Sequence, residues 1–138
     1  MKLTKAMLSL AACALIFTAC KKDEETTPHH NANEVTIEIV RPATDQYIFC
    51  NNVNHLEVNI QATEEIHGYE VKLINLADNS LQWEKHAHVH GTNIQILDST
   101  ITTTVCDSTN ARLDVTVILD HNGNTKTQSQ NVLLGEAL

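Results

Sequence analysis

The sequence predicts an all-β protein, a β-sandwich domain at residues 34–138 that follows a signal peptide and a short tether. Three observations support this prediction. Apolar and polar residues alternate in most segments after residue 33, which is the pattern of half-buried strands. No stretch after the signal shows the 3.6-residue period of an amphipathic helix. The remaining chain of about 105 residues suits a single domain with a single core.

The expected strands present an apolar side chain at every second position. In residues 34–40 these are Val35, Ile37 and Ile39. The same alternation predicts strands at 55–62, 68–74, 81–90, 92–97 and 112–119, and a last strand at 126–134. An Asn-Gly pair at 122–123 predicts a hairpin between the last two strands. About seven short antiparallel strands favour an immunoglobulin-like sandwich.

Two cysteines, Cys50 and Cys106, remain in the folded domain, and we expect them to form a disulfide in an oxidising compartment. Cys50 lies six residues before Leu56, and Cys106 lies seven residues before Leu113, each of which belongs to an expected strand. If those strands are the second and sixth of the sandwich, the bridge joins two loops at one end of it. This differs from antibody-type domains, which place the bridge in mid-core. A two-cysteine metal site is the alternative.

The N-terminus has the features of a lipoprotein signal peptide over residues 1–19. Lys2 and Lys5 precede an apolar run from about Met7 to Phe17, which is too short to span a bilayer as a stable helix. Residues 17–20, "FTAC", resemble a lipobox, with Phe17 at the position where leucine is usual. The resemblance implies that Cys20 is lipidated and becomes the first residue of the mature chain. An ordinary secretory signal is the alternative.

Residues 20–33 form a polar tether whose start, "CKKDEE", resembles the export signal of surface lipoproteins in the Bacteroidetes group. The implied family is that of small immunoglobulin-like surface lipoproteins. Its location would be the outer membrane, with the domain held by the N-terminal lipid and facing the cell exterior; a periplasmic orientation is the alternative. Without residues 1–19 the chain has 7 basic and 17 acidic residues, a net charge of −10 that disfavours nucleic-acid binding.

The segment "LQWEKHAHVH", residues 81–90, places His86, His88 and His90 at strict alternation. Burial of the more apolar odd positions would turn the histidines outward. With a three-residue turn before this strand, His88 would lie opposite Glu70 and His86 opposite Lys72. A two-residue turn would instead place His90 opposite His67.

Imidazoles two residues apart on a strand can hold one Zn²⁺ or Cu²⁺, whereas the outer pair of a flat strand is roughly 13 Å apart. The sequence therefore predicts an open metal site at His86, His88 and His90, with copper preferred over zinc. Glu70, Glu84 or His67 would supply further ligands. The alternative is that these histidines form a plain polar strand face. A less favoured alternative is that one of them is an axial ligand of a haem iron.

We expect no enzymatic activity, because the chain has no phosphate-binding glycine loop, nucleophile elbow or free cysteine. "DST" occurs twice, and it resembles an O-glycosylation sequence of exported proteins in the same bacterial group, which implies modification of Ser99 and Ser108. Aspartate-capped turns explain the same residues equally well. Two functions remain open: capture of Zn²⁺ or Cu²⁺, or an interaction module that holds a protein or glycan partner at the outer membrane.

Overall fold

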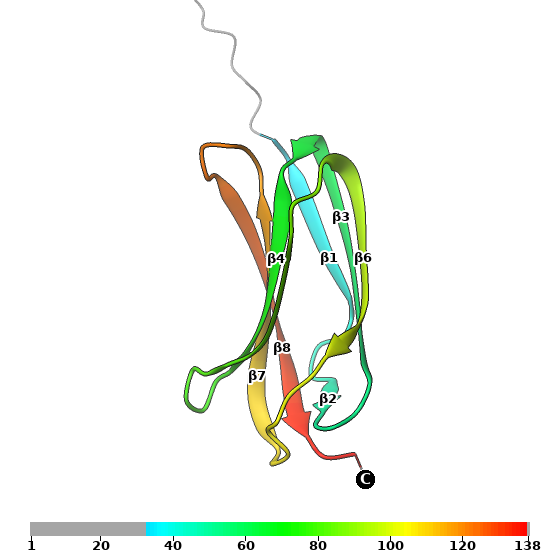
Figure 1. Cartoon of the computed structure of the whole chain (residues 1–138), viewed down its shortest axis with the longest axis vertical. Coiled ribbons are helices and arrows are strands. Elements are labelled where there is room, and N and C mark those ends of the chain that lie inside the picture. Colours follow the sequence, from blue (N-terminus) through cyan, green and yellow to red (C-terminus); the bar gives the residue numbers. More distant parts are fainter. Residues whose placement is uncertain (1–32, 138) are drawn as a thin grey trace, which may run out of the picture. The chain divides into compact units, whose positions relative to one another are not determined.

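A computed structural model describes residues 33–137 as eight β-strands in two sheets (Figure 1). The expected lipidation site and signal peptide lie outside these residues. The strands are β1 (Val35–Arg41), β2 (Tyr47–Phe49), β3 (Asn54–Ile66), β4 (Gly68–Asn75), β5 (Leu81–Ala87), β6 (Gly91–Ile101), β7 (Thr109–Ile118) and β8 (Thr125–Gly135). Within the described residues there is no helix long and apolar enough to cross a membrane.

The two sheets pack face to face as an immunoglobulin-like β-sandwich, which confirms the predicted fold class. One sheet has the strand order β1-β3-β6, and the other β2-β8-β7-β4-β5. Neighbouring strands are antiparallel except for β2, which pairs parallel to β8. The chain stays within one sheet only from β4 to β5 and from β7 to β8, and all the other connections cross between the sheets.

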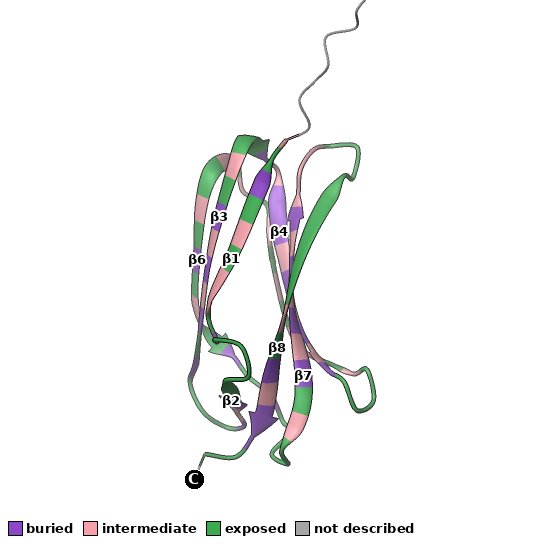
Figure 2. Cartoon of the chain, turned by 180° about the vertical axis from the view of Figure 1, so that it is seen from behind, coloured by how far each residue is buried: buried purple, intermediate pink, exposed green. Residues whose placement is uncertain are grey.

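The core between the sheets consists of the inward-facing residues of the alternating segments (Figure 2). Its fully buried side chains include Leu56, Val58, Ile60, Val71, Leu73, Leu113, Val115, Val117 and Leu134. All residues of this cluster lie between Val35 and Leu134. The apolar core of the described residues therefore lies entirely within the predicted domain at residues 34–138.

Besides shifted ends of β5, β6 and β7, the structure departs from the predicted strands at β2 and β3. β2 was not predicted, because a three-residue strand with one buried side chain, Ile48, is too short to show alternation. β3 continues four residues beyond Ala62, through a polar stretch that does not alternate. There the side chain of Asn33 makes two hydrogen bonds to the backbone of Glu64. The Asn33 side-chain NH₂ donates to the Glu64 carbonyl oxygen, and the Asn33 Oδ1 accepts from the Glu64 N–H.

The disulfide prediction is confirmed. Cys50 and Cys106 are bonded, with an S–S distance of 2.05 Å, and they join the loop before β3 to the loop before β7. The bridge therefore lies at one end of the sandwich and not in its centre, as the cysteine positions indicated.

Gly68 begins β4 where that strand approaches the end of β5. A Cβ atom at position 68 would lie 2.7 Å from the carbonyl oxygen of Ala87 and 3.6 Å from the Cα of His88. We expect Gly68→Ala to lower the free energy of unfolding by about 1–3 kcal/mol, because β5 must move to admit the methyl group. Urea denaturation would measure this loss.

Gly123 provides the matched control for that substitution. It has a positive φ of 85°, but an added Cβ would meet nothing within 4 Å. Gly123→Ala should cost only the backbone strain, about 1 kcal/mol. Equal losses in the two variants would contradict the steric explanation at Gly68.

Candidate functional site

Four histidines from three separate connections meet at the end of the sandwich that is distant from the disulfide. His67 lies at the β3–β4 corner, His88 and His90 lie between β5 and β6, and His121 lies in the β7–β8 hairpin. These three connections share the upper end of the molecule in Figure 1. We call this group, together with Glu65, the histidine cluster.

The imidazole rings of the cluster lie in direct contact. The Nε2 atoms of His88 and His90 are 3.0 Å apart, and their rings are nearly perpendicular, at 87°. The ring centroid of His67 lies 4.0 Å from that of His121 and 5.0 Å from that of His90. Three of the four residues are exposed, and His67 is half-buried. The rings are therefore accessible to a small solute.

Glu65 orients one of these rings. Its carboxylate Oε1 lies 3.0 Å from Nδ1 of His90. When His90 is neutral and Nδ1 donates to this carboxylate, Nε2 carries a free lone pair that points toward His88. Metal-binding histidines usually have such a carboxylate partner on the other ring nitrogen. His90 could therefore serve as a metal ligand, and His88 Nε2 lies 3.0 Å from its Nε2 atom.

His121 is held in place by the turn on either side of it. The carboxylate of Asp120 accepts hydrogen bonds from the backbone N–H groups of Asn122 and Asn124 and from the Asn124 side chain. The Asn124 side-chain bond is the main reason that the pKa of Asp120 is lowered. The turn therefore fixes the backbone that carries the fourth imidazole.

His67 differs from the other imidazoles of the cluster because it is half-buried. Burial lowers its pKa below 6.5, and the nearby His121 and His90 add to the effect. Its Nδ1 is buried without a hydrogen-bond partner. Both observations favour the neutral ring, the form in which an imidazole binds a metal.

Acid should destabilise the metal-free domain through His67. The unfolded chain takes up this proton near pH 6.5, whereas the folded chain takes it up at a lower pH. His67 therefore makes the free energy of unfolding decrease as the pH falls below about 6.5. Denaturation with a chelator at pH 7.5 and 5.5 should show a smaller decrease for His67→Asn than for the wild type. Equal decreases would contradict this role of His67.

The structure corrects the predicted partners of the histidine strand. His86 lies opposite Glu70, and Glu84 lies opposite Lys72, so the predicted register was displaced by two residues. The histidines do face outward as predicted, but β5 ends at Ala87. The chain then leaves the sheet, and this departure lets His88 and His90 meet.

The other predicted ligands lie beside the cluster rather than in it. Glu70, His86 and His88 line a hollow of about 360 Å³ together with Tyr69, Ala87, Thr116, Ile118 and Thr125. Glu70 is engaged by Lys72, whose Nζ lies 2.8 Å from its carboxylate. Glu84 is exposed on β5 next to Lys72. Of the predicted set, the structure therefore brings His67, His88 and His90 into the cluster.

The cluster fits a metal ion only in part. Within residues 33–137, no three histidine, cysteine, aspartate or glutamate side chains are arranged to hold one ion. His88 and His90 supply two donors, and further ligands would come from water or from rotation of His67 or His121. The predicted metal site therefore stays a prediction.

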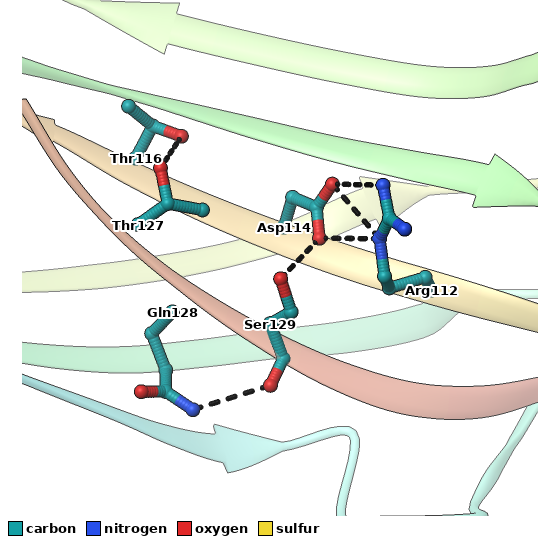
Figure 3. A network of polar contacts seen from close by, with 6 residues as sticks. All are labelled: Arg112, Asp114, Thr116, Thr127, Gln128 and Ser129. Atoms are coloured by element: carbon teal, nitrogen blue, oxygen red, sulfur yellow. Dashed lines mark hydrogen bonds and ion pairs between the residues drawn. The ribbon is translucent and has the colours of Figure 1, made fainter.

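Away from the cluster, the outer face of the five-stranded sheet carries polar contacts that satisfy each other. Arg112 binds Asp114, which also accepts from Ser129, and the hydroxyls of Thr116 and Thr127 are 2.8 Å apart (Figure 3).

The two predicted O-glycosylation residues, Ser99 and Ser108, are both exposed. Beside Ser99, Asp98 accepts hydrogen bonds from the backbone N–H and the hydroxyl of Thr100. These residues lie within β6, so the predicted aspartate-capped turn does not form at this position. Ser108 shares a hydrogen bond of 3.1 Å with the Tyr47 hydroxyl. Modification of either serine stays a prediction.

Together, the fold and the cluster define a small immunoglobulin-like β-sandwich with a histidine-rich end. No protein-family model matches the chain, and none of the curated proteins matches it significantly. It is similar to the solution NMR structure of the CARDB domain of PF1109 from Pyrococcus furiosus, with 18% identity and a TM-score of 0.48. That match covers 76% of this chain and 97% of the other.

A crystal structure of the same Pyrococcus furiosus CARDB domain, in complex with di-metal ions, is a second similar structure. Its identity to this chain is 17% and its TM-score 0.42, over 75% of this chain and 96% of the other. Likenesses of this degree carry no argument about function.

Proposed function

We propose that this domain binds a divalent metal ion, Cu²⁺ in preference to Zn²⁺, at the side chains of His88 and His90. The observation that supports this most strongly is the 3.0 Å separation of their Nε2 atoms. In the metal-free domain with Nδ1–H of His90 toward Glu65, the Nε2–H of His88 donates a hydrogen bond to Nε2 of His90. When a metal ion binds, His88 would carry its proton on Nδ1 instead, so that both Nε2 atoms are free to act as ligands.

The separation lets both nitrogens reach one ion. With metal–nitrogen bonds of roughly 2.0–2.1 Å, two ligands at a tetrahedral angle are roughly 3.3 Å apart, and two at a right angle roughly 2.9 Å. The 3.0 Å hydrogen-bond distance of the metal-free pair lies between these two values, so a small movement of the rings would suit either geometry. The preference for Cu²⁺ rests on the ligand type, because imidazole donors bind Cu²⁺ more tightly than Zn²⁺.

The surroundings suit capture of the ion more than permanent structural binding. His90 has an exposed side-chain fraction of 43%, and Glu65 of 59%. The site is therefore open to water, and coordination positions remain for solvent or for a receiving protein. Glu65 supports His90 from behind, and neutral His67 stands beside it as a further ligand.

In the cell we expect the domain to be held at the outer membrane by a lipid on Cys20, facing the exterior. The acidic excess of the mature chain would attract cations to its surface. The domain would then collect metal ions near the membrane and present them to a partner protein there. The interaction module without metal stays the alternative function.

Calorimetric titration of residues 31–138 with Cu²⁺ and with Zn²⁺ tests the proposal. This piece contains the whole core and excludes His29 and His30 as competing ligands. We expect one Cu²⁺ per chain with micromolar or tighter affinity, and weaker binding of Zn²⁺. Binding of neither ion would overturn the proposal.

A further inference from the structure

A second hollow lies at the opposite end of the sandwich, beside the disulfide. It has a volume of about 590 Å³ and is lined by Tyr47, Phe49, Cys106, Ser108, Gly135, Glu136 and Ala137. This volume is within the range of small-ligand sites, roughly 300–1,000 Å³. The proposed metal site does not use any of these residues.

Two aromatic rings form part of its wall. Tyr47 and Phe49 lie two residues apart on β2, with ring centroids 5.7 Å apart and planes that differ by only 3°. Gly135 allows the Tyr47 ring to approach β8, because a Cβ there would lie 2.8 Å from the Cε1 atom of Tyr47. The Tyr47 hydroxyl is fixed by Ser108 at 3.1 Å. The position of the Tyr47 ring is therefore fixed by its packing against Gly135 and by the hydrogen bond to Ser108.

The charge at this hollow is negative. Glu136 is the one charged side chain among its lining residues, and it is exposed. The exposed Asp107 lies between the lining residues Cys106 and Ser108 in the sequence. Aromatic faces attract cations through the ring quadrupole, and a nearby carboxylate adds to that attraction.

We propose that this hollow binds an organic cation, an alkylammonium or guanidinium group carried on an apolar body. The apolar body lies against Tyr47 and Phe49, and the positive charge lies near Glu136. Two sources share this chemistry: a small quaternary amine, or a lysine or arginine side chain of a protein partner.

The test compares a cation with its neutral isostere. Choline and 3,3-dimethylbutan-1-ol have the same shape and differ in charge, and N-acetylarginine methylamide represents a protein side chain. Each is titrated into ¹⁵N-labelled residues 31–138, whose core is complete, in the presence of a metal chelator. We expect choline or the arginine probe to shift the amides of Phe49, Ser108 and Glu136 saturably, at least about fivefold more tightly than the neutral alcohol. The tighter of the two cations identifies the source.

Three variants complete the test. Glu136→Gln and Tyr47→Leu should lower the affinity for the cation. Tyr47→Phe keeps the aromatic ring and should therefore keep that affinity. The amide spectrum itself reports whether each variant is folded, and the comparison of ligands on the wild type needs no variant. Equal binding of choline and the alcohol, or no saturable shift with either cation, would overturn the proposal. Because the metal is chelated throughout, a failure here is distinct from a failure of the histidine site.

Discussion

Replacing both His88 and His90 by alanine is expected to weaken Cu²⁺ binding by more than about 100-fold, since loss of an outer-shell partner alone costs about 10- to 100-fold. The two Nε2 atoms, 3.0 Å apart, are the only pair of ring nitrogens in the described chain that the structure shows in hydrogen-bonding contact. Both side chains are exposed, so the fold should persist. Calorimetric titration of the double variant measures the effect.

Three single variants define the limits of this site. Glu65→Gln removes the charge behind His90 and should weaken binding by about tenfold. His86→Ala and His55→Ala remove exposed histidines outside the cluster and should change little. If the His88 and His90 double variant bound Cu²⁺ as the wild type does, while His86→Ala lost it, the metal site would lie in the hollow with Glu70 instead.

Removing the disulfide by Cys50→Ala and Cys106→Ala together should cost about 4 kcal/mol of unfolding free energy. The bridge closes a loop of 57 residues, and the chain-entropy model assigns its stabilisation to the restricted unfolded chain. For a domain of this size the loss lowers the melting temperature by about 15 °C or more. Urea denaturation of the wild type and the double variant measures it.

Removal of the disulfide should leave the affinity of the metal site unchanged. The bridge joins loops at one end of the sandwich, and the histidine cluster lies at the other. We expect the double variant to bind Cu²⁺ as the wild type does at temperatures where it is folded. A loss of less than about 1 kcal/mol would contradict the entropic account, and loss of metal binding would show that the two ends are coupled.

Alternation allowed most of the fold to be predicted from the sequence. Each segment with period-two apolar residues became a strand with those residues inward, as in β3 and β7. The outward direction of the histidines followed from the same rule. The exception in β5 is informative: Leu81 is 49% exposed, while Lys85 points inward and binds Asp98 of the opposite sheet.

The candidate site could be predicted only in part, because it depends on where strands end. Nothing in "HAHVHG" marks Ala87 as the last residue of β5, so the departure of His88 and His90 from the sheet could not be predicted. Glu65 and His121 are 25 and 31 residues from His90 in the sequence, and only the packing of three connections brings this end together. One sequence signal did indicate a position at the end of the sandwich: the Asn-Gly pair predicts a hairpin turn, and His121 lies directly before that pair.

The most direct test of the metal site is an anomalous difference map from crystals of residues 31–138 grown with one equivalent of Cu²⁺, collected at the copper edge. We predict a single strong peak between the Nε2 atoms of His88 and His90, at roughly 2.0–2.1 Å from each. A peak at another set of side chains, or no peak at copper concentrations well above the calorimetric Kd, would contradict the account.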